Sequence, residues 1–114
     1  MDAQPTITVA DFDKVDVRVG TVTAAAPFPE ARKPAYTLTV DFGPLGTRRS
    51  SAQLATRYRP EDLVGRQVLA VLNFPPRRIG PFSSQVLVLG VPDGQGGVVL
   101  IGPEREVPNG GRLF

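Results

Sequence analysis

The sequence predicts an all-β fold made of short strands and tight turns. Twelve Gly and twelve Pro are spread along 114 residues, so regular elements must be brief. Several segments alternate apolar and polar residues with a period of two, which is typical of strands with one buried face. A chain of this length buries one hydrophobic core, so we expect residues 1–114 to form a single domain.

The N-terminal part predicts a short helix and then the first strand. Thr8 and Asp11 have the spacing of a helix-capping pair. Residues 15–23 alternate as a strand does, with a bulge or a sharp bend expected at Gly20. Three prolines then favour a loop over residues 24–34.

The middle of the chain predicts two more strands and a second short helix. Residues 36–42 alternate apolar and polar side chains, and residues 43–46 form a turn. We expect residues 47–54 to return as a strand with a polar face. Pro60 begins a helix that ends at Gly65.

The last third predicts two strands covered on both sides, over residues 67–74 and 86–91, because both segments are almost continuously apolar. Residues 73–83 contain three further prolines and read as a second long loop. A hairpin turn at residues 93–97 leads to a last strand over residues 98–101. The tail ends in Leu113 and Phe114, and we expect it to pack against the body.

Three strands, a short helix and two strands, followed by an extra hairpin strand, is the order of an OB-fold, a five-stranded Greek-key barrel. A β-sandwich is the alternative that the same strand spacing allows. In an OB-fold the ligand face is formed by strands two and three and by the loops joining strands one to two and four to five. Those loops correspond to the two proline-rich segments.

Composition excludes several classes of enzyme and site. The chain has no Cys and no His, so it has no disulfide, thiolate nucleophile, imidazole base or Cys/His zinc site. We expect no catalytic residue, no metal and no cofactor. The chain also has no apolar run of membrane-spanning length and no signal-peptide pattern, so we expect a cytoplasmic protein that does not insert into membranes.

Positive charge is concentrated in the middle of the chain. Residues 48–78 hold seven Arg against two acidic residues, which gives +5, whereas the whole chain has a net charge of +2. Arg suits bidentate contacts with phosphate, carboxylate or backbone oxygen atoms. A codon-composition bias is the alternative explanation.

Two sets of side chains are candidates for the ligand face, because aromatics among cations suit either stacked bases or an extended peptide. The candidate peptide-binding residues are Phe28, Tyr36, Ser50, Ser51, Gln53, Phe74 and Phe82. The candidate nucleic-acid-binding residues are Arg32, Lys33, Arg48, Arg49, Arg77 and Arg78. Structural roles are the alternatives: Arg48 and Arg49 could guard a sheet edge, and Phe28 and Phe82 could pin their loops to the barrel.

Five blocks of the sequence resemble the export-related chaperone family CsaA. They cover residues 11–20, 27–36, 50–53, 73–82 and 107–111. The family resembles a free-standing form of the OB-type tRNA-binding domain of methionyl- and phenylalanyl-tRNA synthetases. Where the chaperones often have Met-Ser-Glu, this chain has Ser83, Ser84 and Gln85.

The resemblance implies a homodimer that holds unfolded or preprotein polypeptides in apolar cavities and is linked to protein export. It implies a peptide site lined by the Phe74–Phe82 loop and residues 50–53, with the N-terminal helix and the tail at the subunit interface. Two hypotheses follow: an ATP-independent chaperone that binds peptide segments, and a tRNA-binding OB module.

Overall fold

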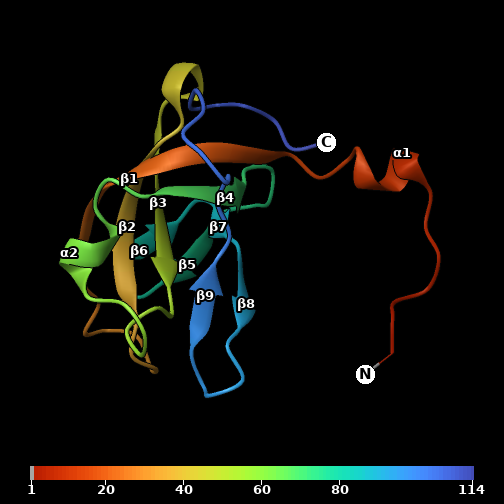
Figure 1. The fold of residues 1–114 in the computed structure, drawn as a ribbon. Helices are drawn as coiled ribbons and strands as arrows, with labels where there is room; N and C mark the ends of the chain where they lie inside the picture. Colours follow the sequence, from red (N-terminus) through yellow and green to blue (C-terminus); the bar gives the residue numbers. More distant parts are fainter. Residues whose placement is uncertain (1) are drawn as a thin grey trace.

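A computed structural model describes residues 2–114 (Figure 1). In chain order, its elements are α1 (Val9–Phe12), β1 (Val17–Pro27), β2 (Tyr36–Asp41), the 3-10 turn η1 (Gly43–Leu45), β3 (Thr47–Ala52), α2 (Pro60–Leu63), β4 (Gln67–Val71), β5 (Arg77–Ile79), β6 (Phe82–Ser84), β7 (Leu87–Val88), β8 (Gly90–Pro92) and β9 (Val98–Leu100). No helix among these residues is long and apolar enough to cross a membrane.

Five antiparallel strands form one curled sheet in the order β3-β2-β1-β4-β7. Alternate side chains of these strands fill its interior, among them Val22, Leu38, Val40 and Val68, all fully buried. All five strands belong to one sheet, which confirms the predicted OB-type barrel and excludes the two-sheet sandwich.

The barrel is nearly closed, because residues 84–86 bond to the outer edge of β3. The Gln85 N–H donates to the Arg49 carbonyl at 2.8 Å. The Ser50 hydroxyl donates to the Val86 carbonyl at 3.0 Å, and Ser50 is fully buried. These bonds satisfy an edge that would otherwise be open to pairing with another chain.

Strand β4 is buried on both faces, as its continuous apolar run predicts. Val68 and Ala70 face the barrel interior, whereas Leu69 and Val71 form a second cluster on the outside. The tail covers this outer cluster: the Gly110 N–H donates to the Val19 carbonyl at 2.8 Å. The tail therefore packs through backbone bonds and through the side chain of Val107, while Phe114, expected to pack, is fully exposed.

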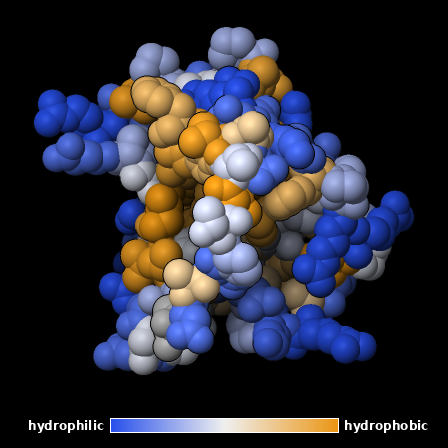
Figure 2. All heavy atoms as spheres, turned by 90° about the vertical axis from the view of Figure 1, so that its right-hand side faces the viewer, coloured by the Kyte–Doolittle hydropathy of each residue, from blue (hydrophilic) through white to orange (hydrophobic). Residues whose placement is uncertain are grey.

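The N-terminal arm, which comprises residues 2–12 and includes α1, stands away from the barrel (Figure 1). Thr8 and Asp11 form the predicted capping box at the start of α1. No residue of α1 is buried, and Val9 is 78% exposed. Figure 2 shows apolar side chains gathered around a hollow on the face towards the arm.

The expected loop over residues 24–34 begins later than predicted, because β1 continues to Pro27. The Phe28 N–H donates to the Ala35 carbonyl on the β2 side, so the nitrogen of Pro27 points away from β2 and no ladder bond is lost.

The bulge expected at Gly20 lies instead between Val22 and Ala24. Gly20 itself pairs regularly with Val68. A Cβ at Gly20 would lie 2.6 Å from the Val40 side chain and 2.7 Å from Phe42, so close packing explains this glycine.

The prolines of the second expected loop do not prevent a hairpin, because Pro75 and Pro76 precede it and Pro81 lies in its turn. Strands β5 and β6 pair within residues 77–84. The prediction of one strand over residues 86–91, covered on both faces, was wrong. The segment divides into β7 and β8, and Leu87 and Val91 are about half exposed, at 49% and 47%. The short β8 pairs with β9 across the predicted turn at residues 93–97.

Candidate binding groove

The two proline-bearing connections meet beside the barrel. Phe28, from the connection between β1 and β2, lies against Phe82 of the β5–β6 hairpin with ring centroids 5.2 Å apart. Both rings are buried, together with Ala35, in a small apolar cluster of their own. The loops thus form one surface, with Phe28 and Phe82 as its interior.

Strand β3 supplies the floor of this surface through its outward-facing residues. Ser50 points into the barrel, so its neighbours Arg49 and Ser51 point outwards. The Arg49 guanidinium lies over the Phe82 ring, 4.6 Å from its centroid. The Ser51 N–H donates to the Ser84 hydroxyl at 3.0 Å, which fixes the hairpin against the strand.

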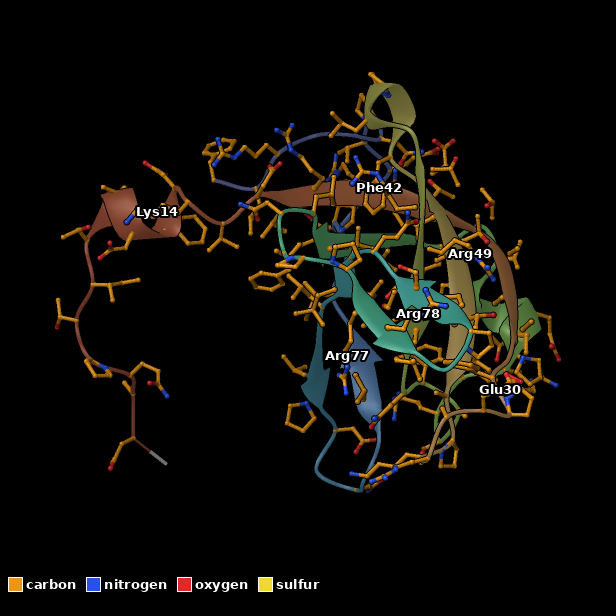
Figure 3. All side chains as sticks on the ribbon, turned by 180° about the vertical axis from the view of Figure 1, so that it is seen from behind. Lys14, Glu30, Phe42, Arg49, Arg77 and Arg78 are labelled. Carbon is orange, nitrogen blue, oxygen red and sulfur yellow. The ribbon has the colours of Figure 1, made fainter. Side chains whose placement is uncertain are left out.

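One hollow at this surface is strongly cationic, and we call it the cationic arm. It has a volume of about 620 Å³. Its lining comprises Glu30, Ala31, Arg32, Lys33, Ala35, Ser51, Gln53, Arg77, Arg78, Ile79 and Gly80. Figure 3 places Arg77 and Arg78 on the hairpin, with Glu30 on the facing connection.

The charge of the cationic arm is not neutralised by the fold. Four basic residues against one Glu give a formal charge of +3. Among residues 2–114, none of the four basic side chains forms an ion pair. Arg78 makes a hydrogen bond to the Gly80 carbonyl at 3.1 Å, which orients it without removing its charge.

Two further hollows, which we call the apolar arm, adjoin the cationic arm. One, of about 250 Å³, lies between Phe74, Pro75 and Leu87. The other, of about 300 Å³, lies between β3 and the β7–β9 region and includes Leu54, Val88 and Leu100. Ser51 and Arg77 line all three hollows, so the hollows adjoin one another, and we call the three together the groove.

The structure brings eight of the candidate residues together in or beside this groove. They are Ser51, Gln53, Phe74, Arg77, Arg78, Arg32 and Lys33 in the lining, and Arg49 above Phe82. Phe74 is half exposed, which makes it available to a ligand.

The other five candidates lie outside the groove. Ser50 and Tyr36 belong to the barrel interior, where the Tyr36 hydroxyl donates to the Tyr58 carbonyl at 2.7 Å. Phe28 and Phe82 are buried against each other, which is the loop-pinning alternative. Arg48 lies on the other face of β3, with a nitrogen 3.4 Å from the Leu45 carbonyl.

Sequence reasoning missed Leu87, Ser84 and Gln85 as parts of this surface. Leu87 stands in a run of apolar residues in which period-two alternation cannot be seen. Ser84 is the last residue of the hairpin and Gln85 follows it, and that position beside a predicted ligand loop was the available signal.

The carboxyl groups with clearly lowered pKa values are Asp11, Asp62 and Asp93, held by backbone N–H groups, and none of them lines the groove. Within residues 2–114, no three acidic side chains gather in a way that could hold a metal ion. The groove can therefore bind by charge, hydrogen bonds and apolar contact.

Comparison with known proteins agrees with this architecture. The family described as a putative tRNA binding domain matches residues 17–112. The structure of the chaperone CsaA from Bacillus anthracis str. Ames is 51% identical, covers 96% of this chain and 100% of its own, and superposes with a TM-score of 0.91. CsaA from Picrophilus torridus is 44% identical over the same shares, with a TM-score of 0.88.

Relatives of another kind carry synthetase names. A MetRS related protein from Pyrococcus horikoshii is 30% identical, with a TM-score of 0.85, and covers 97% of this chain and 100% of its own. The methionine--tRNA ligase of Chlorobium chlorochromatii is 40% identical over 96% of this chain, which spans only 15% of the ligase. The ligase activity thus belongs to a much longer protein.

The fold and these matches define an OB-type binding module. The chain belongs to the putative tRNA-binding domain family, of which it is a CsaA-like member.

Proposed function

We propose that this protein is an ATP-independent chaperone of the cytoplasm that holds unfolded or preprotein polypeptide segments in the groove. The observation that carries the proposal is the apolar arm, where Phe74 and Leu87 are half exposed around one hollow. Exposed apolar side chains that line a concavity are typical of a binding site for apolar groups. The chaperone names of the two CsaA relatives support this assignment.

The groove suits clients of varied sequence. The half-exposed Phe74 and Leu87 offer apolar contact to side chains, while Ser51 and Gln53 offer polar groups to a peptide backbone. Such contacts are independent of a particular client sequence. Binding involves no covalent step, so we propose that the protein is not an enzyme and that clients are released by dissociation. The link to protein export rests on the resemblance to the CsaA family.

We propose further that the protein works as a homodimer. Ile7 and Val9 of the N-terminal arm are 65% and 78% exposed, which is a large apolar exposure for a short segment. Leu113 and Phe114 adjoin an apolar hollow of about 350 Å³ above Val19 and Leu69. A second copy of the chain that covers the N-terminal arm and this hollow would bury the exposed apolar side chains of both. Sedimentation at several concentrations tests the subunit number.

The chaperone assignment is tested by aggregation of a chemically denatured client, with equimolar protein present. We expect suppression by the wild type and a marked loss of suppression in the variant Phe74→Ala/Leu87→Ala. The control is Leu45→Ala/Val64→Ala, which trims two exposed apolar side chains outside the groove. Unchanged aggregation with the wild type contradicts the proposal.

Binding of tRNA is the second candidate function. It is favoured by the four unpaired cations of the cationic arm and by the family to which the chain belongs. Phosphate contacts give a slope of log K against log salt of roughly −0.7 to −0.9 per contact. We expect steep salt dependence for tRNA and much weaker dependence for an apolar peptide. No binding of tRNA at low salt would eliminate this candidate.

A further inference from the structure

The groove joins two kinds of chemistry in a fixed order. Its cationic arm and its apolar arm share Ser51 and Arg77, so a single extended ligand that crosses these residues contacts both. An apolar pocket alone would not distinguish acidic from basic segments. The adjoining charge makes that distinction.

The cationic arm favours an anionic group. Arg32 and Lys33 are exposed and have no acidic partner within residues 2–114, and Arg77 and Arg78 line the same hollow. Glu30 is the one acidic residue in the lining. A basic ligand would meet repulsion from like charges, whereas a carboxylate would be attracted and could accept bidentate bonds from Arg.

The aromatic groups of the groove favour a peptide over single-stranded RNA. Recognition of unpaired bases depends on aromatic faces on which bases stack. Phe28 and Phe82 are buried against each other, and Arg49 occupies the outer face of Phe82. Among the residues that line the three hollows, Phe74 is the one aromatic residue, and it lines a hollow of the apolar arm.

We propose that the groove selects polypeptide segments in which a cluster of Asp or Glu adjoins an apolar stretch. The apolar side chains occupy the hollow beside Phe74 and Leu87, and the carboxylates lie among Arg32, Lys33 and Arg78. Arg77 contacts the junction. This inference rests on the proposed chaperone function and gives it a preferred class of client.

The test uses four fluorescent peptides of equal length, measured by anisotropy at low and at high salt. The first joins Leu-Phe-Leu-Val to Glu-Asp-Glu, and the second joins the same apolar segment to Lys-Arg-Lys. The third carries the acidic segment alone on a Gly-Ser chain, and the fourth carries the apolar segment alone on the same chain. We expect the first peptide to bind roughly tenfold more tightly than the second at low salt, with the gap closing as salt rises.

Charge reversal distinguishes the groove from the general charge of the protein. In Arg32→Glu/Lys33→Glu we expect the preference for the acidic peptide to disappear or reverse, while the fourth peptide binds as it does to the wild type. The matched control, Arg66→Glu/Arg105→Glu, makes the same change in net charge at exposed residues outside the groove. It should retain the preference.

Equal affinity for the first and second peptides, with both bound through their apolar segment, overturns this inference and leaves the chaperone function standing. Loss of the preference in the control variant as well as in the groove variant overturns the assignment to the groove. Failure of all four peptides to bind, with tRNA still bound, overturns the inference and the chaperone function together.

Discussion

Phe28 and Phe82 lie with their ring centroids 5.2 Å apart, and this contact joins the two connections that surround the groove. One ring comes from the connection after β1 and the other from the β5–β6 hairpin. Both are buried. The contact thus holds the connection that carries Arg32 and Lys33 against the hairpin that carries Arg77 and Arg78, and these four residues line the cationic arm.

Replacing Phe82 by Ala should affect stability more than it affects the chemistry of the groove. The substitution removes a buried ring, and we expect a loss of about 3 kcal/mol in the free energy of unfolding. Phe74→Ala should cost below about 1 kcal/mol, because that ring is half exposed. Chemical denaturation of the two variants measures the contrast, and equal losses would contradict the burial described here.

Replacing Ser50 by Ala should loosen the closure of the barrel. Its hydroxyl donates to the Val86 carbonyl at 3.0 Å, and that acceptor would be left buried without its partner. We expect a loss of about 1–2 kcal/mol and faster hydrogen exchange at Gln85, whose N–H bonds to the same strand. Ser51→Ala is the matched control, since its side chain faces the groove. Equal exchange at Gln85 in both variants would argue against this role of Ser50.

The barrel could be predicted because its strands carry the signal locally. Val17 and Val19 alternate with polar residues, and β4 is apolar throughout because both of its faces are covered. The capping residues Thr8 and Asp11 also act within one turn of helix. Such features depend on neighbours in the sequence, so the sequence alone shows them.

The groove was only partly predictable, because its details depend on contacts between distant segments. Phe82 is buried because Phe28 lies against it, and neither ring is marked as buried by its own surroundings. Leu87 faces outwards because the preceding side chain, Val86, is buried in the barrel interior, where the Val86 carbonyl accepts a bond from Ser50 of another strand. The sequence does not show which of Arg48 and Arg49 lies on the groove side of β3. The inward position of Ser50 in the structure shows that it is Arg49.

The hairpin turn between β8 and β9 should make stability depend on pH through Asp93. Its carboxylate accepts bonds from the backbone N–H groups of Gln95 at 2.7 Å and Gly97 at 2.9 Å, and Arg57 lies nearby. These contacts lower the pKa of Asp93 from its ordinary value of 3.8. The folded pKa is thus below the unfolded one, so the stabilisation is complete above the ordinary value and is lost as pH falls through the lowered pKa.

The variant Asp93→Asn tests this dependence. We expect the stability difference between wild type and variant to be constant from about pH 5 to about pH 8 and to shrink below about pH 4. Denaturation by urea at a series of pH values measures it. A difference that grows on acidification would show that the sign is wrong.

Arg77 lines every part of the groove, so its removal should weaken peptide and tRNA binding together. It is exposed and forms no ion pair among residues 2–114, so Arg77→Ala should leave the fold intact. For tRNA, losing one phosphate contact should reduce the slope of log K against log salt by roughly 0.7–0.9. For the peptide that joins an acidic to an apolar segment, we expect a several-fold loss of affinity at low salt.

Two variants are the controls for Arg77→Ala. Phe74→Ala should weaken peptide binding alone, and Arg105→Ala should change the binding of neither ligand. If Arg77→Ala weakens the binding of one ligand and leaves the binding of the other unchanged, peptide and tRNA occupy separate surfaces. Arg77 would then not contribute to binding in both the cationic arm and the apolar arm.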